Sequence, residues 1–160
     1  MAVLHLVWDR SGRLRALVIG ISCLAIIGCE QPDPSLQADE VLQSELGLTA
    51  ADEVHRVTLT GGEVERTDPA ALSIEPGALV EFVTTDWLIH EVIFEADSVD
   101  TEQWSFLERT DQTASPPLIE RDTRYVLTFE GAPPGRYPYL LEGNGASGRG
   151  VIIVTRPEVR

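Results

Sequence analysis

The sequence predicts an all-β domain, a Greek-key β-sandwich of about seven or eight strands, with a short N-terminal helix and a helical excursion around residues 98–110. Apolar and polar residues alternate in several short runs, the pattern of strands buried on one face. Glycine (13 residues) and proline (10 residues) stand in clusters between these runs, as in turns. With 160 residues, 43% of them hydrophobic, the chain can form one such domain and its core.

The first 28 residues have the composition of a secretory signal. Three arginines precede an apolar run at residues 16–28, which is too short to span a bilayer. The run ends in Ile-Ile-Gly-Cys29, which resembles a bacterial lipobox, the motif whose cysteine is lipidated. We expect residues 1–28 to be a lipoprotein signal peptide and Cys29 to attach the protein to the extracytoplasmic, periplasmic side of a bacterial membrane. The alternative is an ordinary signal peptide with an incidental cysteine.

Residues 29–52 are expected to form a lipidated linker with a short amphipathic helix. Asp33 and Pro34 suit an N-cap and a first helical residue, and Gly47 suits the C-terminal stop. The residues predicted to share the apolar face are Ala38, Val41, Leu42 and Leu46. This face is expected to pack on the domain; docking to a partner is the other interpretation.

The domain itself is expected to cover residues 53–156. In the helical excursion, Asp100 and Gln103 are predicted to form a capping box, and Trp104 and Leu107 to share a face. Val80 and Phe82 are predicted to face the core. Strands are predicted at 54–60, 71–74, 79–84, 90–94 and 124–130, around Tyr137 and Tyr139, and at 151–154.

The charge of the chain argues against several functions. The formal net charge is −14, which repels nucleic-acid phosphates and could instead steer a basic partner. No Ser-His-Asp order, cluster of metal ligands or phosphate-binding loop is present, so we do not expect an enzyme.

Three parts of the sequence resemble the cupredoxins, the blue-copper family of plastocyanin and azurin. They are IEPGALVEFV at residues 74–83, His90, and GRYPYLLEGNGASGRGVIIV at residues 135–154. In this family the last stretch carries a cysteine, a histidine and a methionine that bind copper with an earlier histidine. The resemblance places His90 at the first histidine, Leu141 at the cysteine, Asn144 at the second histidine and Arg149 at the methionine.

The chain lacks the ligands that the resemblance implies. A blue-copper site requires a thiolate with two imidazoles, and usually a weak axial thioether. Both cysteines, Cys23 and Cys29, belong to the signal and anchor, and the single methionine is Met1. We therefore predict no blue-copper site and no cofactor.

Two placements of Arg149 are left open. In one, Arg149, Asn144 and a carboxylate from Glu142 or Glu91 form a hydrogen-bonded plug over His90. In the other, Arg149 points into solvent from a flexible glycine-rich loop.

The sequence thus predicts a copper-free, cupredoxin-like lipoprotein that acts as a binding or structural module at the extracytoplasmic membrane face. Its expected partner is a membrane electron-transfer complex, respiratory or photosynthetic, or a basic cytochrome. The alternative is a periplasmic metal-binding or electron-transfer protein with a nonstandard site made of His90 and carboxylates.

Overall fold

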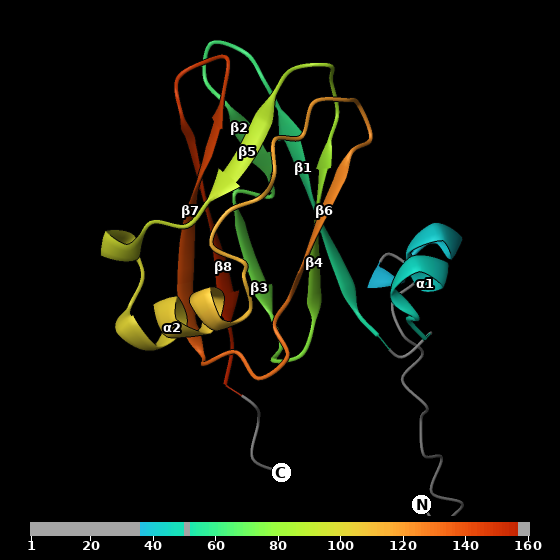
Figure 1. Cartoon of the computed structure of the whole chain (residues 1–160), viewed down its shortest axis with the longest axis vertical. Coiled ribbons are helices and arrows are strands. Elements are labelled where there is room, and N and C mark those ends of the chain that lie inside the picture. Colours follow the sequence, from blue (N-terminus) through green and yellow to red (C-terminus); the bar gives the residue numbers. More distant parts are fainter. Residues whose placement is uncertain (1–35, 50–51, 157–160) are drawn as a thin grey trace, which may run out of the picture. The chain divides into compact units, whose positions relative to one another are not determined.

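The computed structural model describes residues 36–49 and 52–156, and two four-stranded sheets form most of this part of the chain (Figure 1). One sheet has the order β2-β1-β4-β6 and the other the order β3-β8-β7-β5. The strands are β1 Val54–Thr60, β2 Arg66–Asp68, β3 Ala71–Ile74, β4 Leu79–Thr84, β5 His90–Ile93, β6 Arg124–Thr128, β7 Gly135–Gly143 and β8 Gly148–Val154.

The strand order is that of the predicted sandwich. The chain crosses from one sheet to the other at each step from β2 to β7, which produces parallel pairs between β1 and β4 and between β3 and β8. Sequence alternation found seven of the eight strands. It missed β2, a three-residue strand in which only Thr67 is buried.

Aromatic side chains from both sheets fill the core. Phe82 on β4 meets Tyr139 on β7 edge to face, with ring centroids 5.2 Å apart. Phe129 and Tyr137 meet in the same way at 5.3 Å, and the Tyr137 hydroxyl donates a hydrogen bond to the Pro133 carbonyl. Such pairs contribute beyond the area they bury. Val80 and Phe82 are fully buried, as predicted.

The N-terminal helix α1 (Glu40–Leu46) packs on the domain, but it is shorter than predicted. Its N-cap is Asp39 rather than Asp33, because the Asp39 carboxylate accepts hydrogen bonds from the backbone N–H groups of residues 41 and 42. Gly47 ends the helix in the left-handed conformation, as predicted. The predicted signal 1–28, Cys29 and residues 30–35, which include Asp33 and Pro34, lie outside the described residues.

The apolar face of α1 was predicted only in part. Ala38 and Leu42 pack in a small cluster with Val54, against Leu48, Leu79 and Val126. Val41 and Leu46 instead remain exposed. With only two turns, the helix itself buries Leu42 alone, and Ala38 packs beside it from the segment before the N-cap.

The helical excursion consists of the 3₁₀ turn η2 (Ala96–Ser98) and helix α2 (Thr101–Arg109). Leu107 is buried and Trp104 packs against the core, as expected. The predicted capping box is absent. Asp100 is the N-cap but its side chain makes no capping bond, and the buried Gln103 side chain donates to the Pro134 carbonyl instead.

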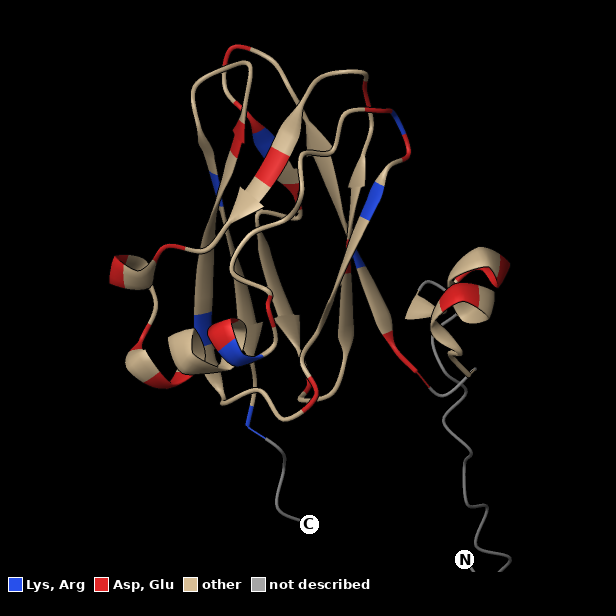
Figure 2. Cartoon of the chain, viewed as in Figure 1, with Lys and Arg blue, Asp and Glu red and all other residues tan. Residues whose placement is uncertain are grey.

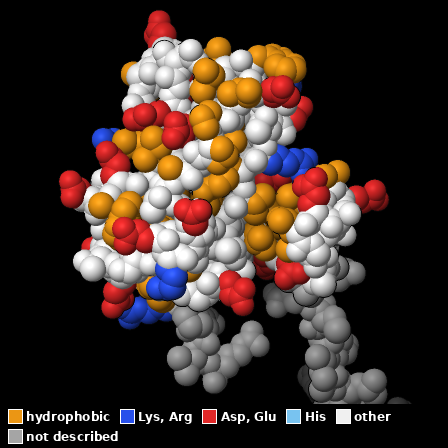
Figure 3. Space-filling view, viewed as in Figure 1, with side chains coloured by type: hydrophobic (Ala, Val, Ile, Leu, Met, Phe, Trp, Pro, Cys, Tyr) orange, Lys and Arg blue, Asp and Glu red, His pale blue; other side chains and the backbone are white. Residues whose placement is uncertain are grey.

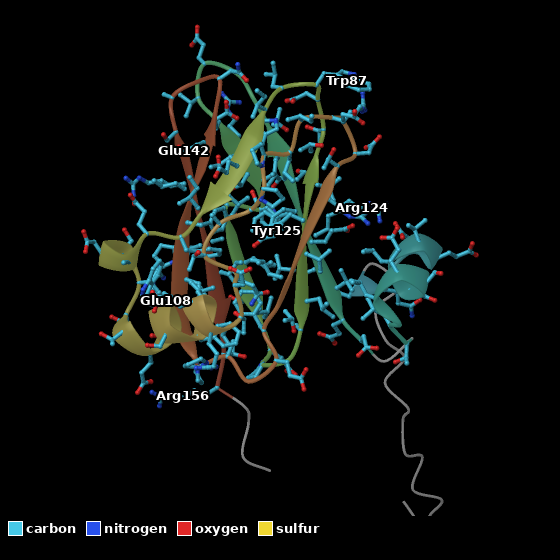
Figure 4. The ribbon with its side chains drawn as sticks, in the orientation of Figure 1. Trp87, Glu108, Arg124, Tyr125, Glu142 and Arg156 are labelled. Carbon is cyan, nitrogen blue, oxygen red and sulfur yellow. The ribbon has the colours of Figure 1, made fainter. Side chains whose placement is uncertain are left out.

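A carboxylate is buried on the outer face of the β1–β4–β6 sheet. Glu81 accepts from Arg56 Nε at 2.8 Å and lies 3.2 Å from Arg124 Nη1. Figure 4 shows Arg124 reaching from β6 toward α1, where the same nitrogen lies 2.6 Å from Asp39 Oδ2. The two arginines therefore compensate the charge of Glu81 and connect it to the cap of α1. No helix among the described residues is long and apolar enough to cross a membrane.

We predict that Leu42→Ala lowers the free energy of unfolding by about 2–4 kcal/mol, because it leaves a cavity between α1 and the sheet. Urea unfolding would measure the change. The control is Val41→Ala on the same helix, whose side chain is exposed and whose loss should change stability by less than about 0.5 kcal/mol. Equal effects of the two substitutions would show that α1 is not held by this contact.

Candidate functional site at the His90 end of the sandwich

The site lies where three loops meet at one end of the sandwich, the upper end in Figure 1. These are the β1–β2 loop (residues 61–65), the β4–β5 loop (residues 85–89) and the β7–β8 loop (residues 144–147). His90, the first residue of β5, lies directly beneath them and is completely buried. Its backbone exchanges two hydrogen bonds with Leu118 and it stands opposite Gly143 on β7, so its position is fixed on both sides.

Both ring nitrogens of His90 face a carboxylate. Nε2 lies 2.8 Å from Oδ1 of Asp86, and Nδ1 lies 3.0 Å from Oε2 of Glu65. The side chains of His90 and Glu65 are fully buried, whereas that of Asp86 is 26% exposed. Within the described part of the chain, His90 Nδ1 and Glu65 Oε2 have no partner except each other. The three side chains are hereafter called the Glu65–His90–Asp86 triad.

Backbone N–H groups complete the triad and connect it to the loops. Asp86 accepts from Gly61 N at 2.8 Å and from Leu88 N at 2.9 Å. Partial burial of Asp86 opposes its ionisation, but hydrogen bonds from Gly61, His90 and Leu88 outweigh it and lower its pKa. Glu65 accepts from Gly145 N at 3.0 Å. Each carboxylate therefore joins His90 to a neighbouring loop.

The glycines at the end of β7 and the start of β8 make room for Glu65. A Cβ atom at Gly143 would lie 2.5 Å from Glu65 Oε1 and 2.6 Å from the Ile89 carbonyl oxygen. At Gly148 it would meet the backbone carbonyl of Glu65. The glycine-rich character of this stretch thus has a steric cause, the close approach of the β1–β2 loop.

The predicted plug does not form, and His90 has other partners. Arg149 is exposed on β8 opposite Leu140, where it borders a small hollow with Glu95 and Ser98. It therefore points outward, as in the second placement, although from a strand rather than from a flexible loop. Glu91 and Glu142 stand opposite each other in the β5–β7 pair, with Glu142 exposed.

Asn144 and Leu141 have structural roles. The Asn144 side chain accepts a hydrogen bond from Ile89 N at 3.2 Å, so it connects the β7–β8 and β4–β5 loops. Leu141 is fully buried in the core, opposite Val92 and Gly148.

Glu65 was not predicted as a site residue, because nothing in its local sequence indicates that it is buried. It stands in Gly-Gly-Glu-Val-Glu, a charged turn between strands, and such residues are usually solvated. Only its partners, 25 and 80 residues further along the chain, explain its burial.

The residues at this end do not fit a blue-copper centre. Leu141 has no donor atom, and both nitrogens of His90 already face carboxylate oxygens on different sides of the ring. Within residues 36–49 and 52–156, no three His, Cys, Asp or Glu side chains are placed to hold a metal ion together.

The solved structures similar to this chain are cupredoxins. An oxidised amicyanin variant is 20% identical over 65% of this chain and 84% of its own, with a TM-score of 0.43. A purple cupredoxin from Nitrosopumilus maritimus is 17% identical over 63% of this chain and 99% of its own, with a TM-score of 0.43. A copper-containing nitrite reductase from Thermus scotoductus is 25% identical over 70% of this chain and 25% of its own, with a TM-score of 0.48.

No family model matches the chain, and no curated protein matches it. The predicted fold class is confirmed by the strand order of the two sheets.

Exposed apolar side chains gather above the triad. Trp87 is 72% exposed and Ile119 is 57% exposed. Trp87 is labelled at the upper end in Figure 4, where orange side chains cluster in Figure 3. Contacts between the loops bring their residues to the same end of the sandwich, since Leu88 lies against Gly61 and the residue before Ile119 pairs with His90. This surface, hereafter the apolar patch, consists of Val64, Trp87, Leu88, Ile89 and Ile119.

Acidic residues surround the apolar patch. Figure 2 shows acidic positions on the β1–β2 loop and on the segment leading into β6, where one arginine, Arg121, lies between two of them. The exposed acidic residues of this end are Glu63, Glu120 and Asp122 on the loops and Glu142 near the end of β7. The end of the sandwich thus combines an apolar centre with a negative rim.

We predict that Asp86→Asn lowers stability at neutral pH by about 1–2 kcal/mol, the size of a charged hydrogen bond partly open to solvent. The pKa of Asp86 is depressed, so its contribution is complete above the unfolded value of 3.8 and is lost as pH falls through the folded value. Urea unfolding at a series of pH values should therefore show the difference between wild type and variant shrinking below about pH 4. The control is Asp97→Asn on the exposed η2 turn, and a constant difference across this range would contradict the prediction.

Proposed function

We propose that this protein is a copper-free, cupredoxin-like lipoprotein that acts as a binding or structural module at the extracytoplasmic membrane face. Its role would be that of an accessory subunit of a membrane electron-transfer complex. The observation that carries the proposal is the triad, because both nitrogens of the one histidine at a family ligand position face carboxylates. A buried leucine at the position of the thiolate supports it further.

The apolar patch is the surface that we assign to the partner. Large exposed apolar groups on a protein surface mark interaction sites, and tryptophan is enriched among residues that dominate binding energy. The negative rim selects a partner whose own apolar surface is bordered by lysine or arginine, such as a basic cytochrome. The same charge repels anionic lipid headgroups, so this end is better suited to a protein than to a membrane.

The proposed anchor would keep the domain close to the membrane. Cys29 lies seven residues before Leu36, the first described residue. Seven residues span at most about 25 Å when fully extended. A lipid on Cys29 would therefore restrict the search of the domain to partners in or near the same membrane.

The geometry of the triad argues against the alternative, a periplasmic metal-binding or electron-transfer protein using His90 and carboxylates. Glu65 and Asp86 approach opposite nitrogens of the ring, so the three groups do not converge on one point.

We expect that Cu(II) added to the purified protein produces no intense visible charge-transfer absorption, because no thiolate is available at the site. Elemental analysis of protein isolated from its own host should likewise give far less than one copper per chain. The control is a blue-copper protein purified and titrated in the same buffers. Stoichiometric copper, or an intense visible band, would overturn the copper-free assignment.

We expect the lipidated protein, solubilised gently from host membranes, to run as part of a larger complex. Replacing the apolar patch residue Trp87 by serine should weaken this association at least tenfold, because a desolvated tryptophan contact is lost. The matched control is Val41→Ser, which removes an exposed apolar side chain from α1. Size-exclusion chromatography with quantitative immunodetection measures the fraction of the protein in the complex and the fraction that runs as monomer. Recovery of monomer alone from wild-type membranes, or equal effects of both substitutions, would contradict the partner assignment.

A further inference from the structure

We propose that His90 is a doubly protonated imidazolium, and that this buried organic cation is the charge that holds the loops of this end together, in place of a metal ion. The proposal concerns the protonation state of one side chain, and it does not depend on the existence of a partner.

The distances on both sides of the ring favour a hydrogen on each ring nitrogen. A neutral imidazole has one N–H and one lone pair, whereas the imidazolium has two N–H groups. The two nitrogens of His90 lie 2.8 and 3.0 Å from carboxylate oxygens of Asp86 and Glu65. A lone pair on either nitrogen would face an oxygen of an ionised carboxylate at hydrogen-bonding distance, beside a fully buried ring where water screens the repulsion poorly.

The charges around the ring also favour the cation. Of the described elements packed against His90, the β1–β2 loop contributes Glu65 and the β4–β5 loop contributes Asp86. Leu118 and Gly143 contribute only backbone at this position. Two carboxylates thus face one imidazole, and a charge of +1 on the ring is the compensation that a buried carboxylate requires.

The surplus negative charge is taken up by backbone dipoles. Asp86 receives the N–H groups of Gly61 and Leu88, and Glu65 receives the N–H group of Gly145. These donors come from all three loops. The imidazolium and its carboxylates therefore connect the β1–β2, β4–β5 and β7–β8 loops through one centre of charge.

The same arrangement keeps metal ions away from the ring. A metal binds imidazole through the lone pair of a ring nitrogen. In the proposed state both ring nitrogens carry a proton and lie within 3.0 Å of a carboxylate oxygen, so a metal would have to displace a proton and break an ion pair.

Nitrogen NMR of the full-length protein labelled with ¹⁵N-histidine tests the proposal. At neutral pH we expect both ring nitrogens of His90 to resonate in the range of protonated nitrogen. His55 is the internal reference. Burial lowers its pKa against the smaller opposing effect of Glu53, so it should show one protonated and one unprotonated nitrogen. Single His→Gln variants assign the three histidines, including His5.

Glu65→Gln provides a second, independent readout. In the wild-type protein Gly145 N and His90 Nδ1 face different oxygens of Glu65, Oε1 and Oε2, so in glutamine an NH₂ group replaces one of these two acceptors. We expect the NH₂ group to face Nδ1, which then becomes an acceptor. The Nδ1 resonance should move into the unprotonated range while Nε2 stays protonated. The matched control, Glu142→Gln, changes an exposed carboxylate on the neighbouring strand and should leave the ring resonances unchanged.

The outcomes separate clearly. Two protonated ring nitrogens in the wild-type protein at neutral pH support the proposal, and one unprotonated ring nitrogen overturns it. Ring resonances in Glu65→Gln that do not differ from those of the wild type overturn the role given to Glu65 in holding the cation. If Glu65→Gln does not fold, the wild-type spectrum alone decides. Loss of the proposed partner, or detection of copper elsewhere in the chain, would leave this result unaffected.

Discussion

The ion pairs of a single buried histidine hold together the end of the sandwich where the candidate site lies. Burying charge costs several kcal/mol per ion unless partners compensate it closely. Here Glu65 and Asp86 compensate the ring, and three loops supply the N–H groups that satisfy the remaining oxygens. The triad and its backbone hydrogen bonds hold the loops in position. The exposed apolar side chains on these loops are therefore positioned by the triad.

A second buried carboxylate, Glu81, lies on the outer face of the other sheet and helps to attach the N-terminal helix. Glu81 is compensated by Arg56 and Arg124, and Arg124 also contacts the cap of α1. One network closes an end of the sandwich and the other attaches the N-terminal segment to its side. In this strongly acidic chain, Arg56 and Arg124 thus lie where they neutralise the buried carboxylate of Glu81.

Local pattern was sufficient for most of the fold. The alternation in residues 54–60 and 79–84 gave the bounds of β1 and β4, because each strand has one face in the core. It failed for β2, which has a single buried side chain, and for the start of α1, where Asp39 and Asp33 are equivalent as caps until the packing of Leu42 is known. The centre of the site was predicted at His90 but not its partners, since the burial of Glu65 depends on contacts across the sequence.

The glycines around Glu65 restrict how this chain could change. Any side chain larger than hydrogen at position 143 would collide with the Glu65 carboxylate and with the Ile89 backbone. A cysteine or histidine introduced at position 143 would therefore meet the buried Glu65 carboxylate beside His90. A single substitution at position 143 therefore cannot add a metal ligand beside His90 while Glu65 keeps its place.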